Sequence, residues 1–454
     1  MSVIYIIFCS ISAVAAFRYI TYGLAFLIVT NCIITIPFDF SSIKIGFATI
    51  AAQDFVIIAL FLRSFIAIAA RQVNTAEILP VLTLIFFIIV GSTKGFLLDH
   101  GKMVSFYRTA IGIGCYYAVF ICTQIISAER IKYLIYVTVI TSLICIALQS
   151  YLISTKNADL IIKFTPWYQN PVNAELLRTN FLANQMPRVF PNGTTAIAML
   201  SGFSLVKALT AKKTKSILIY AALYGVFTLF LMSTGTRGFV FASVVTLSYA
   251  LFAVRNQIKL SRKFALMLMT PILGLGLIYF ILTSDLFGTL MARTEQLQAA
   301  KYQDAGFLSK IYQANVALRI IMENPFGIGL TRPIELEHHL RDSMWDTNSF
   351  LVMGFVGGLP AMISLIWFLI SIYKKYRANL IKSTGDNAVD LIACSAALLY
   401  IFIMTAASFV FTFTTTEAII QLCLFAGFVC KNRLSQKLTI QRLKLNKNLA
   451  RSPS

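Results

Sequence analysis

The chain has 454 residues, of which 58% are hydrophobic and only 13% are charged, and its formal net charge is +21. Soluble domains carry about 25% charged residues, so this composition excludes an ordinary soluble fold. Apolar runs long enough to cross a bilayer core of about 30 Å recur along the sequence, whereas the alternating strands of a membrane β-barrel are not seen. The sequence predicts an all-α polytopic membrane protein.

Apolar runs separated by charged breaks predict about 12 or 13 membrane helices. The predicted spans lie at 3–17, 20–36, 46–66, 77–93, 106–126, 131–152, 192–209, 216–232, 238–254, 265–283, 347–372, 388–410 and 414–430. The first run has no basic residue before it, so we expect a retained helix rather than a signal peptide. No internal repeat of the kind found in many transporters is visible.

Basic residues cluster in short connections and in the tail. These stretches are 211–215, 255–263, 374–382 and the tail after Cys430. Short basic loops face the cytoplasm, so we expect these stretches on the inner side. Arg237 lies in a turn between the first two stretches, with one apolar run on either side, so we expect that turn on the outer face. Basic helix ends match anionic lipid headgroups, and we do not expect nucleic acid as a partner.

This orientation predicts six parts of the chain, and we expect them in a bacterial cytoplasmic (inner) membrane. They are N-terminal helices (1–153), an extracytoplasmic loop (154–191), central helices (192–283), a large partly helical extracytoplasmic loop (284–346), C-terminal helices (347–430) and a basic cytoplasmic tail (431–454). In the large loop, apolar residues spaced i, i+3, i+4 from Leu308 to Ile320 predict an amphipathic helix that ends at Asn324-Pro325. We expect it to lie over the membrane helices or along the interface.

The eight cysteines fall in or at the ends of apolar runs, and no C-x-x-C occurs. We expect packing residues rather than disulfides or a zinc site. The sequences D-x-D, G-x-S-x-G and H-E-x-x-H and a P-loop are also missing. We therefore expect a reaction that needs no nucleotide, no metal and no other cofactor.

The turn Thr234-Gly235-Thr236-Arg237-Gly238 joins two apolar runs and has two interpretations. Arginines at helix ends commonly anchor a protein at the membrane interface. Alternatively, the glycines admit a close ligand, the hydroxyl of Thr236 donates, and the guanidinium of Arg237 binds phosphate through two parallel hydrogen bonds. The residues alone leave both interpretations open.

Further candidates lie on the same predicted face. The cations are Arg188, Arg293, Lys310, Arg319, Arg332 and Arg341, and Asn192 follows Arg188 in "PRVFPNGTTA". Together they suit an anionic lipid-linked ligand such as a polyprenyl diphosphate, although each can instead be solvated or paired with a nearby acid. His338 and His339 are candidate general bases, or else a solvated pair in the loop.

Four segments between Arg188 and Met362 resemble, in the same order, four parts of one known family. They are "RVFPNGTTAIAML", "STGTRGFVFASVV", "SKIYQANVALRIIMENPFGIGL" and "TNSFLVMGFVGGLPAMI". In this order they resemble four parts of the O-antigen ligase and polymerase superfamily of membrane glycosyltransferases. These parts are a proline-asparagine segment, a Ser/Thr-Arg-Gly turn, a loop helix followed by Pro-x-x-Gly-x-Gly, and a His-Asn helix start with Gly-x-x-Gly.

The resemblance implies that a glycan moves from an undecaprenyl diphosphate carrier to an acceptor hydroxyl outside the cytoplasmic membrane. Carried over by position, Arg237 would hold the diphosphate, Arg293 matches an arginine early in the large loop, and Asn348 matches the family asparagine. Two positions depart from the pattern. Lys310 stands for an arginine, and Thr347, preceded by Asp346, stands for the histidine.

The base is therefore His338, His339 or Asp346, or no base is needed. Because of Thr347, we favour a polymerase that joins lipid-linked repeat units over a ligase that uses lipid A-core. The expected partners are the lipid-linked donor and acceptor and membrane lipids, with a chain-length regulator and a flippase as further candidates. A transporter of an anionic solute is the alternative from another class, and Asp54 is then the main buried acid.

Overall fold

Helices make up nearly all of the part of the chain that the computed structural model describes. It describes residues 2–32, 42–45, 48–98, 103–155, 157–164, 174–175, 177–178, 193–233, 237–255, 305–329, 349–408 and 415–431. The elements before residue 165 are α1 (Ser2–Arg18), α2 (Ile20–Cys32), β1 (Ser42–Ile45), β2 (Ala48–Ala51), α3 (Ala52–Ala69), α4 (Thr75–Leu98), α5 (Met103–Phe106), the π-helix η1 (Tyr107–Gly114), the 3-10 turn η2 (Cys115–Tyr117), α6 (Ala118–Ile125), α7 (Ala128–Ser154) and α8 (Ala158–Phe164). The later ones are α10 (Thr194–Thr210), α11 (Thr214–Ser233), α12 (Arg237–Ala253), α15 (Ala305–Glu323), α17 (Ser349–Lys382), α18 (Asp386–Ser408) and α19 (Thr416–Cys430).

Twelve apolar segments among these elements have the composition of membrane helices, six long and six short. The six that are long and apolar enough to cross a membrane are Ala52–Ala69, Thr75–Leu98, Ala128–Ser154, Thr214–Met232, Ser349–Lys382 and Asp386–Thr405. The shorter ones are Ile6–Arg18, Ile20–Asn31, Thr109–Ile125, Thr194–Thr210, Phe241–Ala253 and Thr416–Cys430. A helix satisfies its own backbone hydrogen bonds, which lipid cannot do. The chain is an all-α polytopic membrane protein, as the composition predicts.

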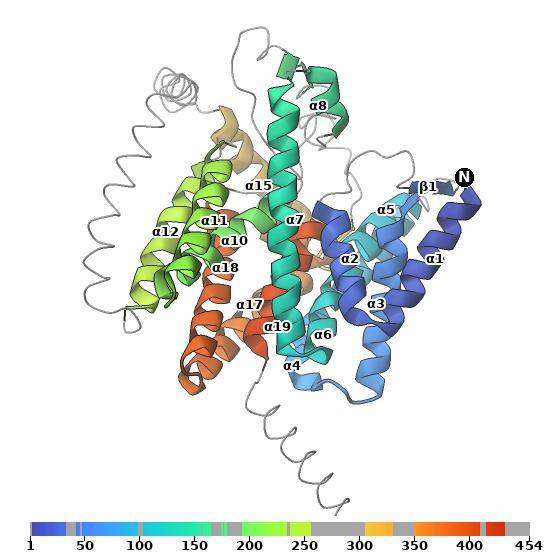
Figure 1. The fold of residues 1–454 in the computed structure, drawn as a ribbon. Helices are drawn as coiled ribbons and strands as arrows, with labels where there is room; N and C mark the ends of the chain where they lie inside the picture. The colour runs from blue at the N-terminus through green and yellow to red at the C-terminus, as the bar shows by residue number, and fades with distance from the viewer. Residues whose placement is uncertain are drawn as a thin grey trace, which may run out of the picture.

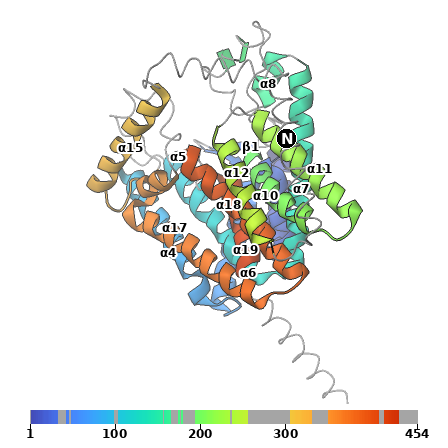
Figure 2. The same cartoon turned by 90° about the vertical axis from the view of Figure 1, so that its left-hand side faces the viewer.

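The bundle packs around one large apolar core. Figure 1 shows α7 running the length of the molecule, with α1 to α3 on one side of it and α11 and α12 on the other. Figure 2 shows α15 at the edge of the bundle, where it contacts α17. Large apolar side chains such as Tyr22, Phe86 and Phe252 point outward and are exposed. In a membrane protein these side chains face the lipid.

One end of the bundle gathers lysines, and we call it the basic end. Lys132 of α7 and Lys207 of α10 both pair with Asp390 of α18. Lys375 of α17 pairs with Glu77 of α4 at 2.5 Å. The pairs join helices that are distant in sequence, so they tie the connections at this end together.

Lys431 lies at the same end, immediately after α19. Its Nζ donates to the carbonyl oxygens of Thr123 and Gln124, both at 3.2 Å, and so satisfies the last turn of α6. Burial lowers the pKa of Lys431 to about 8, and the nearby carboxylate of Glu129 opposes this shift. The lysine is therefore a structural cap rather than a free surface charge.

Two details differ from the sequence prediction. The span expected at 46–66 begins at Ala52, because residues 48–51 pair with residues 42–45 in an antiparallel hairpin. The stretch 374–382, expected as a loop, continues α17 as helix. Its Lys, Arg, Ala and Leu residues favour helix, so α17 extends beyond the apolar layer.

Seven of the eight cysteines, all except Cys32, are buried, as a packing role predicts. Two are Cys394 and Cys423, each with no exposed surface, inside the large core cluster. They act there as small apolar side chains.

Candidate functional site

Most residues singled out from the sequence lie outside the described part of the chain. They are Arg188, Asn192, Thr236, Arg293, His338, His339, Asp346 and Asn348. The predicted span at 265–283 and the basic tail after Lys431 also lie outside it. Arg237 and Lys310 fall within described helices, so only the position of their backbone is known.

Two candidates mark the beginnings of membrane helices. Arg237 is the first residue of α12, and Asn348 directly precedes Ser349, the first residue of α17. The two helices end near each other, because the hydroxyls of Tyr249 and Tyr376 lie 2.8 Å apart. Since both run toward the basic end, both begin at the opposite end.

The start of α12 is held against α18 by Tyr400. The Tyr400 hydroxyl donates to the carbonyl oxygen of Phe239 at 3.0 Å and lies 2.7 Å from the Ser243 hydroxyl. Tyr400 is buried. The backbone that follows Arg237 is therefore fixed by a buried side chain of a different helix.

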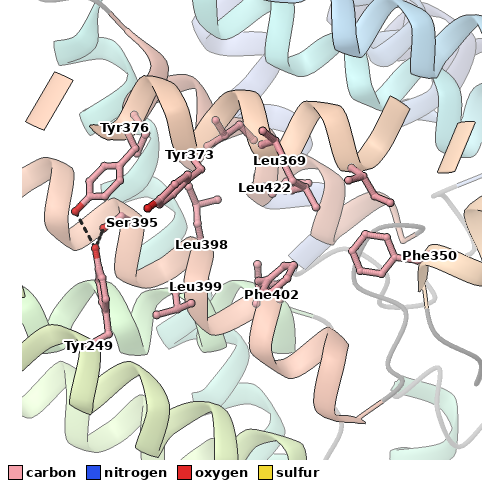
Figure 3. A pocket seen from close by; sticks show the side chains of 15 residues that line it. Tyr249, Phe350, Leu369, Tyr373, Tyr376, Ser395, Leu398, Leu399, Phe402 and Leu422 are labelled. Atoms are coloured by element: carbon pink, nitrogen blue, oxygen red, sulfur yellow. Dashed lines mark hydrogen bonds between the residues drawn. The ribbon is translucent and has the colours of Figure 1, made fainter. Parts of the chain in front are cut away.

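An apolar cavity lies between α12, α17, α18 and α19. Its volume is about 630 Å³, and its lining is almost wholly apolar. The lining includes Tyr249, Phe350, Ile366, Leu369, Ile370, Ile372, Tyr373, Tyr376, Ser395, Leu398, Leu399, Ile401, Phe402, Leu422 and Val429. Figure 3 shows Leu369, Leu398 and Phe402 facing the space between Phe350 and the tyrosines.

The two ends of this cavity differ in chemistry. At one end the Tyr249 hydroxyl contacts both the Tyr376 hydroxyl, at 2.8 Å, and the Ser395 hydroxyl, at 2.6 Å. The other end is marked by Phe350, which lies before the break in α17 at Gly358, whereas Tyr376 lies after it. The cavity therefore borders both parts of the broken helix.

The segment Pro325-Phe326-Gly327-Ile328-Gly329 after α15 pairs with a broken membrane helix. Gly358 interrupts α17 with a φ of +78°, which releases backbone groups on both sides of the break. The carbonyl oxygens of Phe355 and Val356 accept from the N–H groups of Ile328 and Gly329, each at 3.0 Å. Irregular backbone at membrane depth is tolerated where other protein groups satisfy it in this way.

The same segment lies against α4, where small residues make room for it. A Cβ atom on Gly95 would lie 2.1 Å from the carbonyl oxygen of Ile328, and one on Gly91 2.0 Å from that of Val356. The Lys94 Nζ donates to the Asn324 Oδ1 at 2.8 Å. Lys94 is thus a half-buried cation beside the end of α15. It was not among the candidates predicted from the sequence.

The amphipathic helix predicted at the end of the large loop is confirmed. It is α15, it ends at Glu323 directly before Asn324-Pro325, and Val316 and Ile320 are buried against Phe355 of α17. Gly354 of α17 lies against Ile321 of α15. Arg319 lies on the exposed face of the same helix.

Two acids at the end opposite the basic end hold helix starts. Asp54 accepts from the Ala51 N–H at 2.7 Å and so caps α3. Glu417 of α19 accepts from backbone N–H groups at the start of α10. Sequence reasoning noted Asp54 as a buried acid but missed Glu417, because a cap supplied by another helix leaves no local sequence signal. Within the described residues, no group of three or more His, Cys, Asp or Glu side chains could hold a metal ion.

These observations define the chain as a polytopic helical membrane protein with an apolar cavity beside two helices that begin at polar motifs. No protein-family model matches the chain, and no curated protein matches it.

Proposed function

We propose that this protein polymerises undecaprenyl-diphosphate-linked oligosaccharide repeat units on the outer face of a bacterial cytoplasmic membrane. The product is then an O-antigen, a capsule or an exopolysaccharide. The observation that carries the proposal is the apolar cavity lined by α12 and α17, the helices that begin at Arg237 and directly after Asn348. An apolar space between these helices suits a polyprenyl chain, and the cation Arg237 at the start of α12 suits its diphosphate.

The proposed reaction is a displacement at the anomeric carbon of the donor sugar. The acceptor hydroxyl forms the new glycosidic bond, and the bond to the carrier diphosphate breaks with inversion. Negative charge develops on the departing diphosphate, where Arg237, Arg188, Arg293 and Lys310 would stabilise it. His338, His339 or Asp346 would take the proton of the hydroxyl.

The phenotype of a deletion strain tests the proposal and separates it from ligation. Loss of a polymerase leaves single repeat units on the finished surface molecule, whereas loss of a ligase leaves polymer on the carrier lipid. An unchanged, wild-type distribution of polysaccharide chain lengths at the cell surface would overturn both the polymerase and the ligase proposals. Uptake of an anionic solute into proteoliposomes would support the transporter alternative instead.

Substitution of Arg237 by lysine tests the diphosphate site. Lysine keeps the charge but loses the two-pronged hydrogen bonding of arginine, so we expect polymer formation to fall by at least about tenfold. An interfacial anchor would tolerate lysine. The matched control is Arg178→Lys, because Arg178 is exposed and pairs with Asp159 at 3.0 Å. Equal activity of the two variants would contradict the diphosphate role of Arg237.

A further inference from the structure

Glu417 links the start of one membrane helix to the start of another. It lies in the first turn of α19, and its side chain is half-buried. Its Oε2 accepts from the Gly193 N–H at 3.1 Å and its Oε1 from the Ala196 N–H at 2.9 Å. More than 220 residues separate Glu417 from these two donors in the sequence. The carboxylate therefore caps α10 from outside that helix.

The start of α10 cannot supply this cap itself. A helix leaves its first four N–H groups without intrahelical partners, and a side chain at the preceding position usually accepts from one of them. That position is Gly193, which has no side chain and adopts a φ of +85°. A carboxylate is well suited to the task, because the helix dipole adds to the two hydrogen bonds.

The start of α19 is in turn fastened to α2. The Thr416 hydroxyl donates to the Asn31 Oδ1 at 2.8 Å, and the Asn31 Nδ2 donates to the carbonyl oxygen of Leu27 at 2.9 Å. Asn31 is buried. We call Asn31, Thr416, Glu417, Gly193 and Ala196 the clasp. It joins α2, α19 and α10 at the end opposite the basic end.

The clasp fixes the point at which the chain enters α10. Gly193 is covalently bonded to Asn192 and stands five positions after Arg188, and both residues are candidates for the transfer site. Consecutive Cα atoms are about 3.8 Å apart, so a shift of Gly193 moves Asn192 with it. We propose that Glu417 is a positioning residue for the transfer reaction, because it fixes Gly193, the residue to which Asn192 is bonded. The proposal rests on the proposed function.

Kinetics of the Glu417→Gln variant in membranes test the positioning role. Glutamine retains one carbonyl oxygen but turns an amide N–H₂ group toward a backbone donor, so one hydrogen bond of the cap is lost. We expect the KM for the lipid-linked donor to rise about tenfold, with a smaller change in kcat. Glu417→Asp, which keeps both oxygens, is expected to restore part of the loss. The control is Asp386→Asn at an exposed acid of the basic end.

A double variant shows whether Glu417 acts through the segment before Gly193. If it does, Asn192→Ala combined with Glu417→Gln is no worse than the more damaging single variant. Additive losses would overturn the proposal. So would a fall in kcat alone with an unchanged KM, which indicates a role in proton transfer rather than positioning.

A labelling experiment separates this inference from the proposed function, because it needs no activity. A cysteine is introduced at Val189, between Arg188 and Gly193, in a chain with Cys32 replaced by serine. We expect Glu417→Gln to change its rate of reaction with a membrane-impermeant maleimide several-fold, while a cysteine at the exposed Tyr151 reacts as before. Unchanged labelling at Val189 would overturn the clasp, whatever the chain catalyses. Changed labelling in a protein that makes no polymer would support the clasp and contradict the function.

Discussion

Asp390 is a single carboxylate shared by two lysines from different helices. Its side chain is 7% exposed, whereas those of Lys207 and Lys132 are 17% and 39% exposed. The two lysine charges hold the three helices together only while the carboxylate lies between them. Removal of the carboxylate leaves two like charges close together in a partly buried site.

We therefore expect Asp390→Asn to lower the free energy of unfolding by about 3 kcal/mol, at the lower end of the range for broken buried pairs because Lys132 is partly solvated. Chemical denaturation in detergent measures the change. Asp386→Asn is the matched control, because Asp386 pairs with Lys212 on the surface, where both side chains are more than 80% exposed. The control should change stability by less than about 0.5 kcal/mol, and equal effects would show that the Asp390 cluster is dispensable.

At the scale of single elements, the positions of the apolar helices were predictable from composition and length. The predicted and observed limits of the first, seventh and last spans, for example, differ by at most two residues. The hairpin before α3 was not predictable, because strands of four residues are too short to show a period of two. The continuation of α17 past the apolar layer was missed because charge was interpreted as a loop signal.

Fewer features of the candidate site than of the fold could be predicted from the sequence. The starts of α12 and α17 were predictable, because glycines, hydroxyls and an asparagine interrupt apolar runs there. Lys94 and Glu417 were missed, because each acts on a helix far away in the sequence. Such roles depend on tertiary packing, which cannot be inferred from the residues that are adjacent in the sequence.

Gly358 is the single position on which the break in α17 depends. A Cβ atom there would lie 2.0 Å from the carbonyl oxygen of Pro325, and its φ of +78° disfavours any other residue. We expect Gly358→Ala to destabilise the protein far more than Gly385→Ala. Gly385 also has a positive φ, of +59°, but its added Cβ would meet nothing within 4 Å.

The difference between these two variants measures the contact together with the backbone strain at position 358, because the ψ of −175° at Gly358 lies in a region that is essentially restricted to glycine. Thermal unfolding in detergent is a suitable measurement. Similar losses of stability for Gly358→Ala and Gly385→Ala would mean that the loop after α15 yields to the added methyl group.

For the whole molecule, the distribution of lysines predicts the orientation in the membrane. The basic end is expected in the cytoplasm and the starts of α10, α12, α17 and α19 outside. A cysteine at the exposed Tyr151, near the end of α7, should react with an impermeant maleimide in intact cells. A cysteine at the exposed Lys212 should react only after the membrane is opened. The reverse pattern would invert the topology and remove the candidate site from the outer face.

The pairing between the broken helix and the segment after α15 also bears on how the protein is made. The N–H groups of Ile328 and Gly329 leave the ribosome before Phe355 and Val356, their acceptors, have been synthesised. Until then their acceptors on α17 do not exist, and lipid cannot accept hydrogen bonds in their place. Residues 324–329 therefore have to remain in water or within the insertion machinery until α17 has been synthesised, and their pairing with α17 forms only then. Truncation of nascent chains on either side of Leu359 would separate these two stages of insertion.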